Sequence, residues 1–286
     1  MDLERIGVVG GGIMGSGIAE VCARAGSDVL VHDLDIQRAE ACYERVFRSL
    51  HRAVDRGKLE RADAEAALDR LDVTAELGKM SDRQLVIEAV VEEEDAKLAV
   101  FAELDHAVEA DDAILASNTS SIPIMKLAMA TSRRSNVVGL HFFNPVPVLR
   151  LVEVVPSLLT SEDTVQRVSS FAGGRLHKHV IRSQDRAGFI VNALLIPYIL
   201  SAIRMLESGF ATAEDIDAGM VEGAAHPMGP LALADLIGLD TTMAVALSLY
   251  EEFKEPLFAP PPLLSRMVDA GLLGRKTGRG FLSYDA

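Results

Sequence analysis

The chain has 286 residues, of which 49% are hydrophobic and 24% charged, a composition typical of a globular protein with one large or two ordinary domains. Its formal net charge of −14 argues against a general affinity for nucleic acid or an anionic membrane, because both partners need a basic face. The longest apolar run, residues 193–203, holds 11 residues and is too short to span a bilayer, and the first strand begins too early for a signal peptide. We therefore expect a cytoplasmic protein.

A glycine-rich turn follows the first predicted strand, residues 6–9. The turn reads Gly10, Gly11, Gly12, Ile13, Met14 and Gly15. In the pattern G-x-G-x-x-G, Gly10 allows a tight turn, Gly12 lets the backbone approach a pyrophosphate, and Gly15 lets helix and strand pack closely. The phosphates would lie at a helix N-terminus, where free N–H groups and the helix dipole favour anions. A glycine-rich turn that binds nothing is the alternative.

An acid closes the second predicted strand, since Asp33 lies 18 residues after Gly15. A strand before the glycines, a helix after them and an acid at this distance are the context of a dinucleotide site. Asp33 would accept hydrogen bonds from the adenosine ribose hydroxyls, and its charge would repel a 2′-phosphate. The motif therefore favours NAD over NADP.

Strands and helices alternate through the first two thirds of the chain. Further strands are predicted at residues 85–89, 113–116, 137–140, 149–155 and 179–182. Helices are predicted at residues 36–56, 61–70, 94–108 and 162–172, with a short one from Pro123. This alternation predicts a doubly wound, Rossmann-type α/β domain over residues 1–184, with a helical-hairpin insertion at about 36–70. Cys22 and Cys42 fall in separate predicted helices without disulfide or metal-ligand spacing, which indicates core or helix-face residues of a reducing compartment.

The strand pattern disappears after about Ser183. Helices are predicted at residues 189–207, 212–222, 230–237, 241–253 and 262–270. Residues 185–286 should therefore form an all-helical C-terminal domain. Its apolar character suggests a homodimer formed through these helices, and packing against the first domain is the alternative.

A histidine and a glutamate face each other in one candidate hairpin. His141 ends a predicted strand, Glu153 lies on the next one, and both are equidistant from Pro147. An antiparallel pairing would place imidazole and carboxylate side by side, which fixes the tautomer and raises the basicity, as general acid–base catalysis requires. A histidine at a strand end is, however, more often structural.

Two further polar residues have open roles. Ser120 ends the loop after the strand at 113–116, on the same sheet edge, where its hydroxyl would bind a substrate oxygen or cap the following helix. Asn192 is a polar residue in an apolar helix. It would make either a buried helix–helix hydrogen bond or a contact in the interdomain cleft.

Several stretches together resemble the L-3-hydroxyacyl-CoA dehydrogenase family, and most closely its bacterial 3-hydroxybutyryl-CoA dehydrogenases. They are VVGGGIMGSGIA, LVIEAVVE, LASNTSSIPI, GLHFFNPVPVLRLVEVV, GFIVNALL, HPMGPLALADLIGLD and GRKTGRGF. They occur in the family's order between residues 5 and 281, and HFFNPVPV and HPMGPLALADLIGLD are far more specific than the glycine motif.

The resemblance implies a role for each matching position. His141 matches the catalytic histidine, Glu153 the carboxylate that orients it, and Ser120 and Asn192 the residues that hydrogen-bond the reacting oxygen. The implied cofactor contacts are Gly10, Gly12, Ile13, Met14, Gly15, Asp33, Glu92, Lys97, Ser120, Asn144 and Lys276. The implied substrate contacts are Ser49 and Arg56, where the family's hairpin meets coenzyme A, with Lys58 as a neighbouring candidate. Solvated helix-end charge is the alternative for Arg56 and Lys58.

The implied reaction is the reversible, NAD-dependent oxidation of a (3S)-3-hydroxyacyl-CoA to a 3-oxoacyl-CoA, with no metal. His141 would take the hydroxyl proton while hydride leaves the substrate, in a cleft that closes on the acyl-CoA. One alternative is a dehydrogenase of a free or carrier-bound 3-hydroxy acid on the same fold. The other is a non-catalytic NAD-binding structural protein, as in a crystallin relative of the family.

Overall fold

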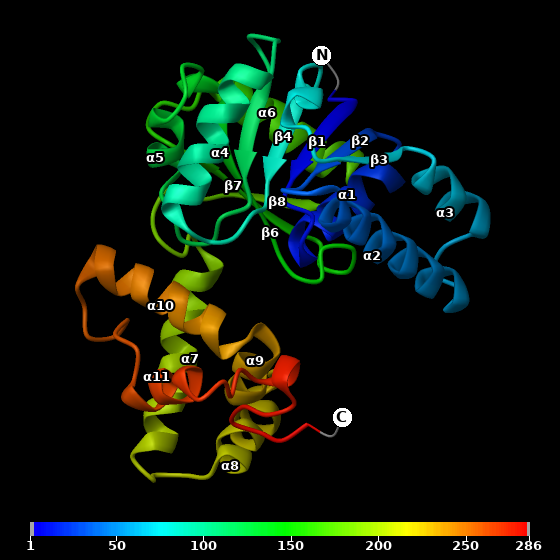
Figure 1. Cartoon of the computed structure of the whole chain (residues 1–286). Helices are drawn as coiled ribbons and strands as arrows, with labels where there is room; N and C mark the ends of the chain where they lie inside the picture. The colour runs from blue at the N-terminus through cyan, green and yellow to red at the C-terminus, as the bar shows by residue number, and fades with distance from the viewer. Residues whose placement is uncertain (1–2, 285–286) are drawn as a thin grey trace. The chain divides into compact units, whose positions relative to one another are not determined.

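The computed structural model describes residues 3–284 and divides into two compact units, the first ending at Asp185 and the second beginning at Arg186 (Figure 1). The first unit contains one eight-stranded sheet in the order β3-β2-β1-β4-β5-β6-β7-β8. The strands are β1 (Arg5–Val9), β2 (Asp28–His32), β3 (Leu71–Thr74), β4 (Leu85–Glu88), β5 (Ile114–Ser117), β6 (Val137–Phe142), β7 (Leu151–Pro156) and β8 (His179–Arg182). Neighbouring strands run parallel except for the antiparallel pair of β6 and β7.

Helices connect these strands, so the predicted doubly wound Rossmann-type architecture is confirmed (Figure 1). They are α1 (Ile13–Arg24), α2 (Ile36–Asp55), α3 (Arg61–Leu68), α4 (Glu94–Ala107), α5 (Ile124–Met129) and α6 (Glu162–Ser170). Shorter 3-10 turns lie at Leu77–Met80 and Arg134–Asn136, and a π-helical turn at Phe171–Arg175 extends α6. The strands β4, β5 and β6 are buried at every position, as parallel strands covered on both faces require.

The long helix α2 shows how local sequence produces this arrangement. Asp35 caps its N-terminus by accepting a 2.8 Å hydrogen bond from the Arg38 amide. Its buried residues recur at helical spacing, at Ala39, Cys42, Val46 and Leu50. This face packs on the core, while the opposite face stays polar. Cys22 of α1 and Cys42 of α2 are both free and buried, as predicted.

The structure corrects several predicted boundaries. Strand β3 was not predicted at all, because the alternation of apolar and polar residues in LDVT covers only four positions. Strand β6 continues through His141 to Phe142 instead of ending at Leu140, since its ladder with β7 extends to that residue. Strand β7 begins later than predicted, because the amides of Val148 and Leu149 both donate to the Pro145 carbonyl in a turn.

The second unit is helical, as predicted, and has its own apolar core. Its helices are α7 (Val191–Glu207), α8 (Ala213–Ala218), α9 (Pro230–Ile237), α10 (Leu239–Phe253) and α11 (Pro262–Asp269), with a π-helical turn at Gly219–Gly223 and a 3-10 turn at Arg275–Thr277. The Thr212 hydroxyl caps α8 by accepting from the Asp215 amide at 3.1 Å. Within residues 3–284, no single helix is long and apolar enough to cross a membrane, although α9 and α10, bent by 98°, meet that length and composition together.

Candidate active site

The glycine-rich turn between β1 and α1 has the geometry that a dinucleotide requires. Gly10 has φ +95°, a left-handed conformation that favours glycine. A Cβ at Gly15 would lie 1.8 Å from the Gly10 carbonyl oxygen, whereas a Cβ at Gly12 would meet no atom within 4 Å. No side chain caps α1 at Gly12, so the first amides of this helix are available to an anion. The turn therefore fits a pyrophosphate.

Asp33 follows β2 directly and is oriented by the turn itself. Its Oδ2 accepts a 2.9 Å hydrogen bond from the Gly11 amide, and its Oδ1 accepts one of 2.8 Å from Leu34. Arg45 of α2 donates to the Gly11 carbonyl, which ties the helical hairpin to the same turn. The carboxylate thus lies beside the pyrophosphate turn with lone pairs left for ribose hydroxyls.

His141 and Glu153 are paired across β6 and β7 in the register that their distance from Pro147 predicted. The His141 Nδ1 lies 2.7 Å from the Glu153 Oε2, and the two residues are only 3% and 0% exposed. When Nδ1 donates its proton to this carboxylate, Nε2 carries the lone pair of the neutral imidazole. The arrangement supplies a base that is oriented and shielded from water.

The Ser120 hydroxyl lies 3.0 Å from the His141 Nε2, on the opposite side of the ring from Glu153. The alternative role of capping the next helix does not apply to Ser120, because Asp185 accepts the Ile124 and Met125 amides at the start of α5. Ser120 is therefore free to point at the imidazole. A substrate oxygen placed there would meet a hydroxyl donor and a base together.

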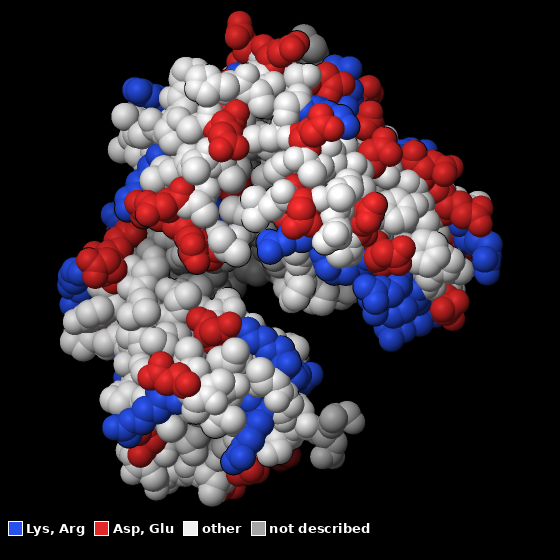
Figure 2. Space-filling view, viewed as in Figure 1, with Lys and Arg blue, Asp and Glu red and all other residues white. Residues whose placement is uncertain are grey.

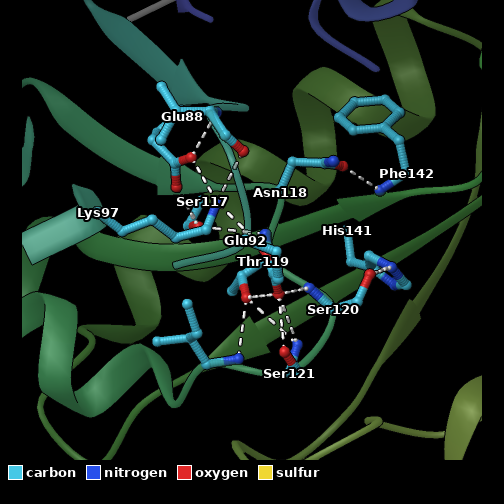
Figure 3. Close-up of polar contacts among 12 residues, drawn as sticks. Glu88, Glu92, Lys97, Ser117, Asn118, Thr119, Ser120, Ser121, His141 and Phe142 are labelled. Atoms are coloured by element: carbon cyan, nitrogen blue, oxygen red, sulfur yellow. Dashed lines mark hydrogen bonds and ion pairs between the residues drawn. The ribbon is translucent and has the colours of Figure 1, made fainter. Parts of the chain in front are cut away.

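Glu92 holds the loop that carries Ser120 (Figure 3). Its Oε1 accepts hydrogen bonds from the Thr119 hydroxyl at 2.5 Å and from the Ser120 and Ser121 amides at 2.8 and 3.1 Å. Burial alone would raise the pKa of Glu92, but the Lys97 ammonium and these hydrogen bonds outweigh it and lower the pKa. The carboxylate is consequently ionised at neutral pH.

Behind this loop lies a buried charge pair, part of which the sequence interpretation missed. Lys97 of α4 is 1% exposed and donates to Glu88 at 2.5 Å, and Glu88 at the end of β4 is 0% exposed. Ser117 donates to the other Glu88 oxygen at 2.6 Å. Glu88 was assigned to a buried strand without a role. A charged residue inside the apolar strand LVIE was the signal that could have identified it.

A basic groove runs along α2. Ser49, Arg56 and Lys58 line a cavity of about 520 Å³ together with Glu20, Arg24, Arg52, Ala53, Pro145, Pro147 and Val148. A second cavity of about 320 Å³ shares Glu20, Ser49, Arg52, Pro145 and Pro147 with it and extends to Ile13, Arg45 and Asn144. Figure 2 shows Lys and Arg side chains gathered over the α2 side of this unit.

The groove therefore connects the glycine-turn end of α1 with the cations at the end of α2. Arg24 was not singled out from the sequence, because only the packing of α1 against α2 brings it to Ser49 and Arg56. Arg52 was also missed, although it lies one helical turn from each of them on α2. Burial raises the pKa of Glu20 on the floor of this groove, although Ser49 and Arg24 oppose the shift.

Two of the predicted site residues belong to the helical unit. Asn192 is the second residue of α7 and is half-buried. The Lys276 ammonium lies 2.6 Å from each Asp240 carboxylate oxygen. The structure brings His141, Glu153, Ser120 and Glu92 together within the first unit, and it describes Asn192 and Lys276 within the second. Over residues 3–284, no group of three or more His, Cys, Asp or Glu side chains could hold a metal ion.

Several known proteins are similar to this chain in sequence and in fold. The family described as 3-hydroxyacyl-CoA dehydrogenase, NAD binding domain, matches residues 5–186, and the corresponding C-terminal domain matches residues 188–284. The chain is 57% identical to a Mycobacterium tuberculosis 3-hydroxybutyryl-CoA dehydrogenase over 282 residues, which cover 99% of each chain. The crystal structure of M. tuberculosis FadB2 has a TM-score of 0.98 at 57% identity, covering 100% of both chains. Ralstonia eutropha (S)-3-hydroxybutyryl-CoA dehydrogenase PaaH1 has a TM-score of 0.94 at 43% identity, also covering 100% of both.

Proposed function

The chain belongs to the 3-hydroxyacyl-CoA dehydrogenase family, and we propose that it catalyses the reversible, NAD-dependent oxidation of (3S)-3-hydroxybutyryl-CoA to acetoacetyl-CoA. The observation that carries this proposal is the buried His141–Glu153 pair, with the Ser120 hydroxyl 3.0 Å from the imidazole Nε2. Two of the similar proteins, from M. tuberculosis and R. eutropha, are named 3-hydroxybutyryl-CoA dehydrogenases. In this chain His141, Glu153 and Ser120 supply the base, its orienting acid and a hydroxyl donor.

His141 is the general base of the oxidation and the general acid of the reverse reaction. Its Nε2 takes the proton of the substrate C3 hydroxyl. NAD, held at the glycine turn and Asp33, would supply the redox chemistry of the oxidation. The imidazolium that forms is stabilised by the Glu153 carboxylate at 2.7 Å. Because both residues are buried, this stabilisation is little screened by water.

Ser120 and Asn192 hydrogen-bond the reacting oxygen in this mechanism. Such donors are typically worth about 10²–10³-fold in rate each, because they meet the charge that develops on the oxygen. The Ser120 loop is already held by the ionised Glu92, so little rearrangement is needed when substrate binds. Asn192 is assigned from the family motif GFIVNALL and lies at the start of α7.

The proposed cofactor contacts belong to the first unit, except for Lys276, which is assigned from the family motif GRKTG of the helical unit. The turn residues Gly10, Gly12, Ile13, Met14 and Gly15 hold the pyrophosphate, and Asp33 binds the adenosine ribose. Glu92, Asn144 and Lys276 contact the nicotinamide half. Lys97 is 1% exposed, so its part in this set is to hold Glu92 in place.

The basic groove along α2 is the proposed site of the coenzyme A nucleotide. Ser49, Arg56 and Lys58 line it, and Arg56 and Lys58 are exposed to a ligand. Arginine pairs with phosphate through two parallel hydrogen bonds, which suits the diphosphate of coenzyme A. A free 3-hydroxy acid would have no group to place there, so the groove favours the acyl-CoA over the smaller substrate.

Assembly and location complete the proposal. A homodimer formed through the helical unit would cover the large apolar side chains that this unit exposes, among them Phe210 at 79% and Leu194 at 73%. A cytoplasmic location agrees with the two free, buried cysteines.

The test compares acetoacetyl-CoA with acetoacetate as oxidants of NADH. We expect turnover with acetoacetyl-CoA, and a large loss of that turnover in His141→Gln while NADH binding persists. Turnover with acetoacetate alone would instead favour a free-acid dehydrogenase. Absence of any NADH-dependent turnover would favour a non-catalytic binding protein.

A further inference from the structure

Glu88 is a buried acid that the reaction described above does not use. It is 0% exposed at the carboxyl end of β4, the strand between β1 and β5 in the centre of the sheet. Its Oε1 accepts hydrogen bonds from the Val90 amide at 2.7 Å and the Lys97 ammonium at 2.5 Å, and its Oε2 accepts one from Ser117 at 2.6 Å. Burying a carboxylate is unfavourable unless such partners compensate it. These partners compensate both carboxylate oxygens of Glu88.

Lys97 is shared unequally between two acids. Its ammonium lies 2.5 Å from Glu88 but 3.3 Å from the Glu92 Oε2. Because attraction between charges falls with distance, Glu88 is the stronger partner. Glu92 therefore keeps its Oε1 for the loop, where the hydroxyls of Thr119 and Ser121 and two amides donate to it.

Glu88 also holds the first residues of the same loop directly (Figure 3). The Ser117 hydroxyl donates a hydrogen bond to the Glu88 Oε2, and it accepts one of 3.1 Å from the Thr119 backbone amide. The backbone N–H of Asn118 donates to the backbone carbonyl of Glu88 at 2.8 Å. The loop from 117 to 121 is thus anchored at its start by Glu88 and at its end by Glu92, and its Ser120 faces His141.

We propose that Glu88 is a positioning residue for the reaction, which holds Lys97 and Ser117 so that Glu92 stays on the loop and Ser120 stays against His141. This inference rests on the proposed function for its kinetic part only. In Glu88→Gln, one amide oxygen replaces two carboxylate oxygens and the charge is lost. Of the two carboxylates that Lys97 pairs with, Glu92 then remains. Lys97 draws the Glu92 carboxylate toward itself and away from the loop amides.

The kinetic test is a double-mutant cycle with Ser120. We expect Glu88→Gln to lower kcat for acetoacetyl-CoA reduction by about tenfold to 10²-fold, because small misplacements of a reacting group cost that much, while the KM changes by less than about threefold. In a Ser120→Ala background, the same substitution should lower kcat by less than about twofold, since the group that it positions is gone. A loss of equal size in both backgrounds would overturn the proposal.

The structural test does not depend on turnover. Amide hydrogen exchange at Ser120 and Ser121, whose N–H groups bond Glu92, should be faster in Glu88→Gln than in the parent protein. Glu76→Gln, which breaks the exposed pair with Lys79, is the matched control and should change neither exchange nor kcat. Unchanged protection of the loop would refute the positioning role, whereas a protein inactive on acetoacetyl-CoA refutes only the proposed function.

A second variant covers the case in which Glu88→Gln fails to fold. Ser117→Ala keeps the buried Glu88–Lys97 pair and removes one hydrogen bond between Glu88 and the loop. Like Glu88→Gln, it should speed amide exchange at Ser120 and lower kcat, but by a smaller factor in each case. Parent-like values for both in Ser117→Ala would count against the proposal.

Discussion

The most direct prediction concerns the carboxylate behind the catalytic histidine. Glu153→Gln removes one negative charge while keeping the size of a side chain that is 0% exposed. With Nδ1 and Oε2 2.7 Å apart, the charge centres of the pair are about 4 Å apart, and at an effective dielectric constant of about 20 their attraction is about 4 kcal/mol. The charge on the imidazole exists only after proton transfer, so this attraction lowers the barrier and not the energy of the bound substrate.

We therefore expect kcat to fall by about 10²–10³-fold, the lower value applying where glutamine still orients the ring through a neutral hydrogen bond. The assay is NAD reduction with saturating (3S)-3-hydroxybutyryl-CoA, the direction in which the imidazole starts neutral, with NADH binding measured by fluorescence as the control. That binding should stay within about twofold of the parent, since no cofactor contact is assigned to Glu153.

The matched experiment adds Glu153→Gln to His141→Gln. If the carboxylate acts through the imidazole, the second substitution should cost little once the imidazole is gone. A kcat within about twofold of the parent in Glu153→Gln alone, or equal losses with and without His141, would refute the reasoning.

Three further predictions concern the cofactor, the groove and the loop. Asp33→Ala should narrow the preference for NADH over NADPH, because it removes the charge beside the turn that repels a 2′-phosphate; equal efficiency with both cofactors in the parent protein would contradict this role. Arg56→Ala should raise the KM for acetoacetyl-CoA by about tenfold with little change in kcat, and should not affect acetoacetyl-pantetheine, whereas Arg182→Ala on the exposed strand end should change neither. The Lys97 ammonium and the loop hydrogen bonds hold the pKa of Glu92 below its ordinary value of 4.5. The contribution of Glu92 to the unfolding free energy is therefore full above pH 4.5 and is lost as the pH falls through the lower folded-state pKa. The difference in unfolding free energy between parent and Glu92→Gln should accordingly shrink on acidification below pH 4.5, and a constant difference across that range would argue against it.

Much of the fold and part of the site follow from local sequence. The apolar runs of the parallel strands, the helical spacing of the buried α2 residues and the glycine pattern all depend on neighbours a few residues away, which is why they can be read without coordinates. The His141–Glu153 pairing was also accessible, because antiparallel partners lie at equal distances from the centre of the connection, here Pro147.

Other features depend on contacts between distant segments, which only the tertiary structure decided. The start of α5 is capped by Asp185, which lies 61 residues beyond Ile124 in the sequence. Ser120 does not serve as this cap, and its hydroxyl lies against His141. Strand β3 is identified by its ladder with β2, since an alternation over only four residues is a weak signal.

The buried charges show the same division. The sequence placed Glu88 in an apolar strand, but the side chains that hydrogen-bond its carboxylate oxygens come from α4 and from the end of β5. Local periodicity determines which residues form a helix or a strand. Long-range packing determines which polar groups are removed from water together, and a buried polar group can only be tolerated with the partners that the fold brings to it.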